Sequence, residues 1–384
     1  MKVAILNYWY EIGGTENAMI GMVKELVKRN HDVTIFSYYN EGELLERLPK
    51  EVKVKKIELS FLVKSLIKHY DSKGLVRFIQ KSIHKTSTLF IPKKEKEKLY
   101  RYVLSKIKPV PGKYDLLLDF YGYGDLLTAI GARKINATKK ATWLHDEKVF
   151  FVSWIRRYYK DYNRIFCVSE SVRDNLLNEY PKLTKKTEVF YNFIDLDRII
   201  NKSKEQCGSY FKGDFKIVTV GRLTEQKGVD IAVETANKLN KQKVSVYWYV
   251  YGDGPEREKL QKKIDEYGLT DRFFLMGTVS NPFPYIKNCD LYAQPSRHEG
   301  YCTTLIEAKT LNKPIISSDI PSARVQIKDG VNGFLCDLNS DRLSEKIKEL
   351  VKSPEKLNVI VENLANEEKY SSKDFEKIER MCGE

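Results

Sequence analysis

The feature that most constrains the fold is a regular alternation of short apolar runs with amphipathic ones. In the first half of the chain, apolar runs typical of buried strands are separated by helical patterns, the first of which covers Thr15 to Arg29. Strands that are apolar on both faces indicate an α/β fold with a parallel sheet covered by helices on both sides. The runs that we interpret as strands are Val3–Tyr8, Asp32–Tyr38, Asp115–Phe120, Ala141–His145, Arg164–Ser169 and Thr187–Asn192.

The second half of the chain repeats this plan after a polar stretch that begins near Asn192. Its expected strands are Lys216–Gly221, Ser245–Gly252, Arg272–Gly277, Cys289–Gln294 and Pro314–Ser318. The chain of 384 residues is long enough for two Rossmann-like domains, which we place at residues 1–191 and 192–365. Ligands in such folds bind at the carboxyl ends of the strands, so we expect the two domains to enclose a substrate cleft.

The composition is that of a globular protein, with 42% apolar and 31% charged residues. No apolar run approaches the ~18 to 20 residues of a membrane span, and the first apolar run is too short for a signal peptide. We therefore expect a cytoplasmic protein. The six cysteines include no Cys-x-x-Cys pair, which suits reduced thiols rather than a disulfide framework or a zinc site. We expect none of them to be a nucleophile.

The net charge of +14 is concentrated in one region. Residues 53–108 contain sixteen Lys and Arg but only four Asp and Glu, a local net charge of +12. We interpret this part of the first domain as a basic insertion. Its interleaved apolar residues fit an anionic membrane surface, a nucleic acid, or merely a solvated face.

The segment from Pro295 to Pro314 places Glu299 and Glu307 eight positions apart around an expected helix start. Eight residues of helix rise span ~12 Å, whereas the two carboxylates of a glycosidase lie ~5 to 9.5 Å apart. This spacing therefore favours two acids that bind opposite ends of one long ligand over the two catalytic acids of a glycoside hydrolase. The backbone from Gly300 to Thr303 would offer helix N-terminal amides to a phosphate. An alternative without any ligand is a capping box formed by Thr304 and Glu307.

A second loop, Gly221 to Gly228, follows an expected strand and carries Arg222 and Lys227. These two cations suit a diphosphate leaving group, although two surface cations are the alternative in so basic a chain. Asp195-Leu196-Asp197 imitates a metal-binding Asp-x-Asp motif, but its position favours a helix cap. We therefore predict that no metal is required.

The Glu-x7-Glu pair that begins in Pro-Ser-x-x-Glu-Gly, together with the Gly-Arg-Leu-x-x-x-Lys-Gly loop, resembles the donor site of family 4 retaining glycosyltransferases with the GT-B fold. The resemblance implies that Glu307 binds the ribose of a nucleotide sugar and that Glu299 lies beside the transferred sugar. It also implies that Arg222 and Lys227 clamp the diphosphate. In that fold the last helix, within residues 366–384, crosses back to the first domain.

The resemblance implies further site residues. His145, which ends an expected strand, would act beside the reacting carbon as a catalytic residue. Cys302 stands where the family often has glycine, which leaves the identity of the donor sugar open. The other donor-binding residues implied are Gly14, Gly221, Gly252, Gly254, Gly300, Tyr301 and Thr303.

The resemblance predicts transfer of a hexose or N-acetylhexosamine from a nucleotide sugar, with UDP as the expected nucleotide. The acceptor is expected to be a hydroxyl of a glycan or lipid-linked glycan in cell-surface polysaccharide synthesis, with retention of anomeric configuration. We expect no nucleic-acid partner, and docking on the inner face of the plasma membrane would suit the basic region. The alternatives are a nucleotide-sugar epimerase of the same fold and a non-catalytic basic binding subunit.

Overall fold

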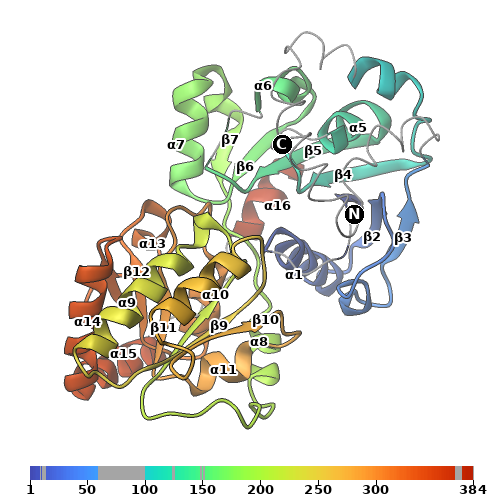
Figure 1. Cartoon of the computed structure of the whole chain (residues 1–384). Coiled ribbons are helices and arrows are strands. Elements are labelled where there is room, and N and C mark those ends of the chain that lie inside the picture. Colours follow the sequence, from blue (N-terminus) through green and yellow to red (C-terminus); the bar gives the residue numbers. More distant parts are fainter. Residues whose placement is uncertain are drawn as a thin grey trace. The chain divides into compact units, whose positions relative to one another are not determined.

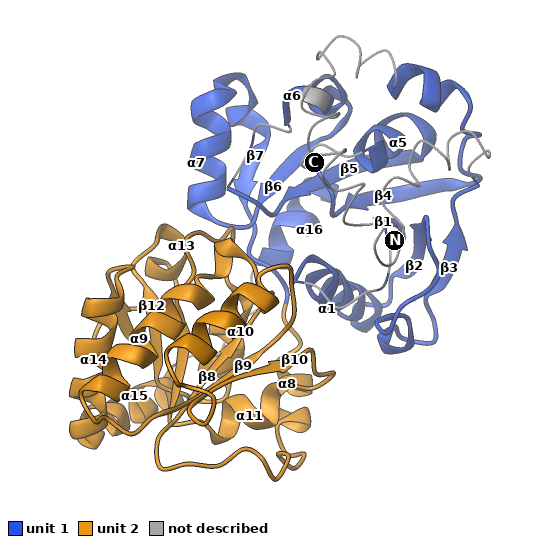
Figure 2. Ribbon diagram, viewed as in Figure 1, with its two compact units in different colours: residues 1–193, 373–384 blue, residues 194–372 orange. Residues whose placement is uncertain are grey.

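The computed structural model describes residues 1–8, 10, 14–58, 100–122, 126–147, 149, 152–367 and 374–383. The chain forms two compact units (Figure 2). Unit 1 comprises Met1–Phe193 and Lys373–Glu384, and unit 2 comprises Ile194–Ser372. Each unit contains one parallel sheet, which confirms the two parallel α/β sheets predicted from the sequence.

The sheet of unit 1 has, within its described residues, the order β3-β2-β1-β4-β5-β6-β7 (Figure 1). In β1, every residue after Lys2 is buried, which explains the continuous apolar run there. The strands are β1 (Lys2–Asn7), β2 (Asp32–Ser37), β3 (Lys53–Lys56), β4 (Lys113–Asp119), β5 (Asn136–Leu144), β6 (Arg164–Cys167) and β7 (Thr187–Val189). The helices within its described residues include α1 (Gly14–Lys28), α5 (Leu126–Lys134), α6 (Val152–Ile155), α7 (Glu170–Glu179) and α16 (Phe375–Gly383), with 3-10 turns η1 (Leu45–Arg47), η3 (Arg156–Asp161) and η4 (Pro181–Lys186).

The last helix, α16, belongs to unit 1. Arg29, which follows α1, lies over the ring of Phe375 at 4.2 Å and forms an ion pair with Glu379. Lys377 Nζ donates to the carbonyl oxygen of Val189 at 2.6 Å. These contacts attach the end of the chain to the first unit, and the bond between Lys377 and Val189 joins residues 188 positions apart in the sequence.

The sheet of unit 2 has the order β10-β9-β8-β11-β12-β13. Its strands are β8 (Lys216–Val220), β9 (Tyr247–Tyr251), β10 (Phe273–Gly277), β11 (Leu291–Gln294), β12 (Ile315–Ser318) and β13 (Phe334–Cys336). Its helices are α8 (Leu196–Lys202), α9 (Val229–Lys241), α10 (Arg257–Glu266), α11 (Phe283–Asn288), α12 (Thr303–Thr310), α13 (Pro321–Arg324), α14 (Ser340–Lys352) and α15 (Pro354–Asn366), with the 3-10 turn η5 (Glu225–Lys227).

Two buried apolar clusters cover the two faces of this sheet. Side chains of α9, α10, α14 and α15 form one cluster, and side chains of α8, α11, α12 and α13 form the other. Along β9, Trp248 and Val250 join the first cluster, whereas Tyr249 and Tyr251 join the second. This alternation has the period of two that a strand requires.

The strand order of unit 2 indicates where on its sheet a ligand is expected to bind. The chain passes from β8 to β9 on one side of β8, and later returns to place β11 on the other side. The loops that follow β8 and β11 therefore leave in opposite directions. In open parallel sheets, such a switch point forms a crevice at the carboxyl ends of the strands, where ligands bind.

Candidate active site

The loops that follow β8 and β11 are joined to each other at this switch point. The backbone N–H of Arg297 donates to the carbonyl oxygen of Gln226 at 2.8 Å, and Gln226 Nε2 donates to the carbonyl oxygen of His298 at 3.0 Å. The guanidinium of Arg297 also binds both carboxylate oxygens of Asp230, at 2.8 and 2.7 Å. Paired bonds of this type fix orientation as well as distance. The two loops thus form one rigid unit.

Gly228 makes this close approach possible. It has a left-handed backbone with φ +64°, and a Cβ atom at this position would lie 1.9 Å from the carbonyl oxygen of Pro295. Only glycine avoids both the strain and the collision. The residue that precedes it, Lys227, is thereby directed toward the loop after β11.

The structure brings together two of the predicted catalytic residues, Lys227 and Glu299. Lys227 Nζ lies 2.6 Å from Glu299 Oε1, and the side chains are 16% and 8% exposed. Burial alone would lower the pKa of Lys227, but the Glu299 carboxylate outweighs this effect and the pKa is raised. Lys227 is therefore a charged ammonium at neutral pH.

Arg222 adds a second positive charge to the same crevice. Its side chain is exposed, and its charge acts on that of Lys227. The backbone next to it is bonded to the loop after β9, because Leu223 N donates to the carbonyl oxygen of Asp253 at 3.0 Å. Among the residues that the structure describes, Arg222 has no carboxylate partner. It is available to bind an anion.

Two of the predicted donor-site glycines have a packing role. A Cβ atom at Gly252 would lie 1.9 Å from the carbonyl oxygen of Gly221, and one at Gly254 would lie 2.3 Å from that of Leu223. A Cβ atom at Gly221 would meet only the stem of Lys227, at 3.4 Å. The glycines at 252 and 254 therefore allow the loops after β8 and β9 to pack together, while a direct contact with a donor stays a prediction.

The carboxyl group of Glu307, on α12, makes no hydrogen bond or ion pair within the described part of the chain, and the residue is only partly exposed to water. Burial raises the pKa of Glu307 to about 7, and the charges of Arg198 and Lys227 only partly oppose this rise. A carboxyl group in this state can accept two hydrogen bonds from a ligand. Arg198, on α8, is half-buried and lies over the ring of Phe283 at 5.1 Å.

The alternative capping box is wrong. The residue before the first turn of α12 is Cys302, whose side chain caps no amide. The hydroxyl of Thr304 instead donates to Gln294 Oε1 at 3.0 Å. Glu307 is therefore not needed by the helix terminus, which leaves its carboxyl group for another role.

The other residues predicted around the start of α12 differ in exposure. Cys302 is buried, with its Sγ 3.2 Å from Thr304 Oγ1, and burial raises the pKa of its thiol to about 12. A protonated thiol is a poor nucleophile. Gly300, Tyr301 and Thr303 are partly exposed, so their backbone can be reached by a ligand.

His145 and Gly14 lie in unit 1, which is described by itself. His145 directly follows β5, and its ring stacks on that of Phe120 with centroids 6.3 Å apart. Burial lowers the pKa of His145 to about 3, against a smaller opposing effect from a backbone hydrogen bond with Phe120. The imidazole is therefore neutral and can act through hydrogen bonds but not as a cation. Gly14 is exposed at the start of α1.

No metal site is formed by the residues that the structure describes, since no three His, Cys, Asp or Glu side chains gather there. Asp195 Oδ1 accepts a hydrogen bond from the backbone N–H of Arg198 at 2.9 Å and caps α8, as predicted. Independence from metals stays a prediction. Within the same described residues, the helices are all too short or too polar to cross a membrane.

Sequence reasoning missed three residues of this site, namely Arg198, Gln294 and Ser296. Gln294 and Ser296 are 1% and 0% exposed and connect to Glu299 through hydrogen bonds. The sequence did contain one sign of Gln294's role, because it is a polar residue at the end of an otherwise apolar strand. A buried amide in that position needs partners, and the partners are found in the site.

Comparisons with known proteins show which family and which structures the chain resembles. Residues 202–367 match the family described as Glycosyl transferases group 1. An uncharacterised glycosyltransferase of Methanocaldococcus jannaschii is 28% identical over 229 residues, which cover 55% of this chain and 53% of that protein. The Campylobacter jejuni N-acetylgalactosamine-N,N'-diacetylbacillosaminyl-diphospho-undecaprenol 4-alpha-N-acetylgalactosaminyltransferase is 28% identical over 207 residues, which cover 53% and 54%. The chain thus spans about half the length of these curated relatives.

Among solved structures, Anabaena HepE in complex with UDP and glucose is similar to the whole chain. The TM-score is 0.70 with 19% sequence identity, and the match covers 100% of this chain and 99% of that one. The chain therefore has the GT-B fold, which confirms the fold predicted from the sequence.

Proposed function

We propose that this protein is a retaining glycosyltransferase of family 4 that uses a UDP-linked hexose or N-acetylhexosamine. The acceptor is a hydroxyl group of a glycan or lipid-linked glycan in cell-surface polysaccharide synthesis, reached from the cytoplasmic side of the membrane. The observation that carries this proposal is the gathering of Arg222, the Lys227–Glu299 pair and the unpaired Glu307 at the switch point of unit 2. The Campylobacter relative, whose name describes a diphospho-undecaprenol-linked acceptor, supports the acceptor class.

Each of these residues has a separate role in the proposed reaction. Glu307 accepts hydrogen bonds from the ribose hydroxyls, while Arg222 and Lys227 neutralise the diphosphate. As the bond between the anomeric carbon and the diphosphate breaks, negative charge grows on the leaving oxygen. These cations act most strongly at that stage, which is the requirement for catalysis rather than mere binding.

The new bond forms between the anomeric carbon and the acceptor oxygen, on the face that the diphosphate leaves. The acceptor's proton passes to an oxygen of the departing diphosphate, so that charge and atoms balance. No protein nucleophile is needed for this route, and the buried Cys302 thiol is not suited to be one. Glu299, held beside Lys227, faces the transferred sugar, and the neutral His145 contributes hydrogen bonding.

The first experiment is hydrolysis of a panel of nucleotide sugars without acceptor, because many transferases transfer their donor slowly to water. We expect turnover of one UDP-sugar, also in excess chelator. Release of an epimerised sugar would instead indicate an epimerase. Absence of both turnover and nucleotide binding would leave a non-catalytic binding subunit. For an identified acceptor, the anomeric proton coupling of the product reports whether configuration is retained.

A further inference from the structure

A chain of buried hydrogen bonds runs from the end of β11 to the carboxylate of Glu299. Tyr292 OH and Thr304 Oγ1 both donate to Gln294 Oε1, at 2.8 and 3.0 Å. The amide of Gln294 then donates through Nε2 to Ser296 Oγ at 2.8 Å, and Ser296 donates to Glu299 Oε1 at 2.7 Å. Every bond in this chain is of ordinary length and lies within one unit.

The direction of the chain follows from the chemistry of its members. The Glu299 carboxylate can only accept hydrogen bonds, so Ser296 directs its single proton to Oε1 and its own oxygen accepts from Gln294 Nε2. The amide nitrogen of Gln294 therefore faces Ser296, and its Oε1 is left to accept from the hydroxyls of Tyr292 and Thr304. The order of donors is thus set by the carboxylate and is transmitted back to β11.

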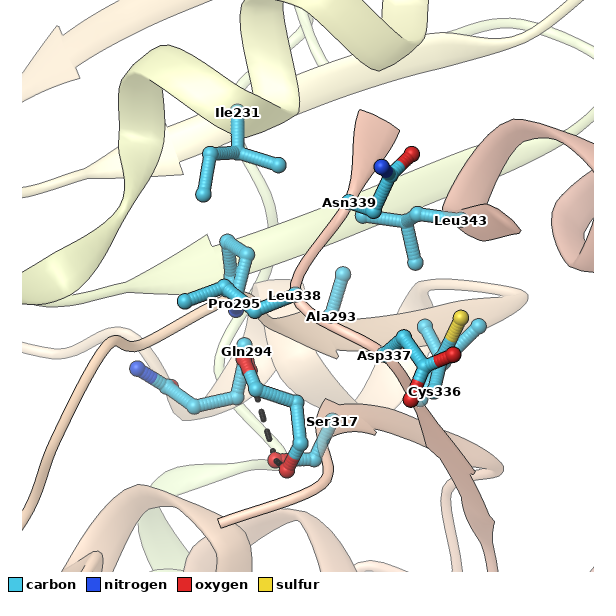
Figure 3. Close-up of a pocket in the computed structure, with 12 residues that line it drawn as sticks. Ile231, Ala293, Gln294, Pro295, Ser317, Cys336, Asp337, Leu338, Asn339 and Leu343 are labelled. Carbon is cyan, nitrogen blue, oxygen red and sulfur yellow. Dashed lines mark hydrogen bonds between the residues drawn. The ribbon is translucent and has the colours of Figure 1, made fainter. Parts of the chain in front are cut away.

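The backbone of Gln294 is fixed as well. Ser317 Oγ and Ser318 Oγ, at the end of β12, each donate to the carbonyl oxygen of Gln294 at 3.3 Å, and Figure 3 shows the bond from Ser317. Gln294 also lines a small pocket there, with apolar neighbours such as Ile231 and Leu343. The side chain is thus held on the sheet while its amide reaches into the loop.

At the receiving end, both fixed donors bind the same oxygen. Glu299 Oε1 accepts from Ser296 and from Lys227 at 2.6 Å. Within the described residues, Oε2 has no hydrogen-bond partner. A carboxylate held at one oxygen from two directions cannot rotate freely, so its second oxygen is aimed at a fixed point.

We propose that Gln294 and Ser296 are positioning residues that hold Glu299 with Oε2 directed toward a hydroxyl group of the donor sugar. The inference rests on the proposed function, because it assigns a purpose to the orientation of a donor-site carboxylate. Lys227 also faces the proposed diphosphate, whereas Ser296 serves only to hold Glu299 Oε1.

The test is a double-mutant cycle on donor hydrolysis, with UDP affinity measured by calorimetry. Ser296→Ala and Gln294→Met should each lower kcat about tenfold, the scale expected for loss of orientation, with little change in the dissociation constant of UDP. The double variant should be no slower than either single one, because removal of any link breaks the same chain. Thr310→Val is the control, since its buried hydroxyl donates to the carbonyl oxygen of Ile306 within the same helix and, among the described residues, to no group of the site. Its kcat should equal that of the wild type.

The outcomes separate this inference from the proposed function. If the wild type turns over no nucleotide sugar and binds no UDP, the proposed function is wrong and the inference falls with it. If the wild type is active, three results would each overturn the inference while leaving the proposed function standing. These are an unchanged kcat in both single variants, losses in kcat that multiply in the double variant, and a UDP affinity that falls together with kcat. Melting temperatures report whether each variant is folded, and Ser296→Ala removes only one oxygen atom, so the cycle does not depend on the larger change at Gln294.

Discussion

At the scale of single residues, Arg222 and Lys227 are the two cations of the proposed diphosphate site. Arg222→Ala or Lys227→Ala should lower turnover about 100-fold, because each removes a charge whose effect is greatest in the transition state. Steady-state donor hydrolysis measures this loss. Lys241→Ala, which removes an exposed charge at the end of α9, is the matched control and should leave turnover unchanged. Near-normal rates in both site variants would contradict the clamp.

Glu307 should give nucleotide binding a distinct pH dependence. Its pKa in the folded protein is about 7, and only the ionised form offers two equivalent acceptor oxygens, one for each hydroxyl of a ribose. UDP affinity should therefore be full above pH 7 and fall by up to about tenfold for each pH unit below it. Calorimetry at pH 6, 7 and 8 measures this change. The same titration of Glu307→Gln shows how much of the pH dependence comes from the ionisation of UDP itself, because Gln does not titrate. If the UDP affinities of the two proteins depend on pH in the same way, Glu307 is not the group that binds the ribose.

The same carboxyl group should oppose folding at alkaline pH. Because burial raises the pKa of Glu307 from 4.5 to about 7, its favourable contribution to stability is complete below pH 4.5 and is lost as the pH rises through 7. Glu307→Gln should accordingly raise the melting temperature of the free protein at pH 8 by a few degrees while it weakens UDP binding. A lower melting temperature at pH 8 would indicate that the carboxylate has a structural role.

The sequence predicted which residues form the site better than how they contact one another. Glu299 and Lys227 were both expected there, but their ion pair depends on a contact between loops that lie 72 positions apart in the chain. Ser296 was overlooked because the turn after β11 decides which side chains its hydroxyl meets. Arg198 resembled an exposed helical arginine, and only the packing of α8 on α12 and Phe283 reveals its burial.

At the scale of elements, the junction of η5 and α9 depends on Gly228. Gly228→Ala should destabilise the protein by roughly 3 kcal/mol or more, since a left-handed backbone and a collision with Pro295 are combined. Gly268→Ala is a matched control with φ +63° and open space around its Cβ position, and it should cost only about 1 kcal/mol. Chemical denaturation measures both values. Equal losses would show that the contact with Pro295 is unimportant.

Element boundaries were harder to predict than the elements themselves. The run Thr187–Asn192 was expected to be a strand throughout, but β7 ends at Val189. Beyond it, the backbone N–H of Tyr191 donates to Asp374 Oδ2 at 2.6 Å instead of to the sheet. β3 was not anticipated because Lys53–Lys56, which we had placed in the basic insertion, contains a single apolar residue. Its pairing with β2 stabilises this strand, although its own residues have a low propensity for strand structure.

At the scale of the whole molecule, the charge is distributed too unevenly to reflect solubility alone. The region 53–108 carries +12 of a net +14, and its residues 59–99 lie outside those that the structure describes. The prediction that this region docks on a membrane therefore rests on the sequence alone. An enzyme that acts on a lipid-linked acceptor has to meet a membrane surface, so this prediction and the proposed acceptor class can be tested together.

If about four cations of this region approach an anionic bilayer, at roughly 1 kcal/mol each, binding should be reversible and modest. Salt should weaken it as the Debye length falls from ~10 Å at 0.1 M to ~3 Å at 1 M. Sedimentation with anionic vesicles should pellet the wild type in low salt, whereas zwitterionic vesicles should not. Replacement of Lys64, Lys68, Arg77 and Lys81 by Glu should abolish pelleting while donor hydrolysis continues, because these positions lie outside unit 2. Equal pelleting with both kinds of vesicle, or none with either, would indicate that the basic region is only a solvated surface.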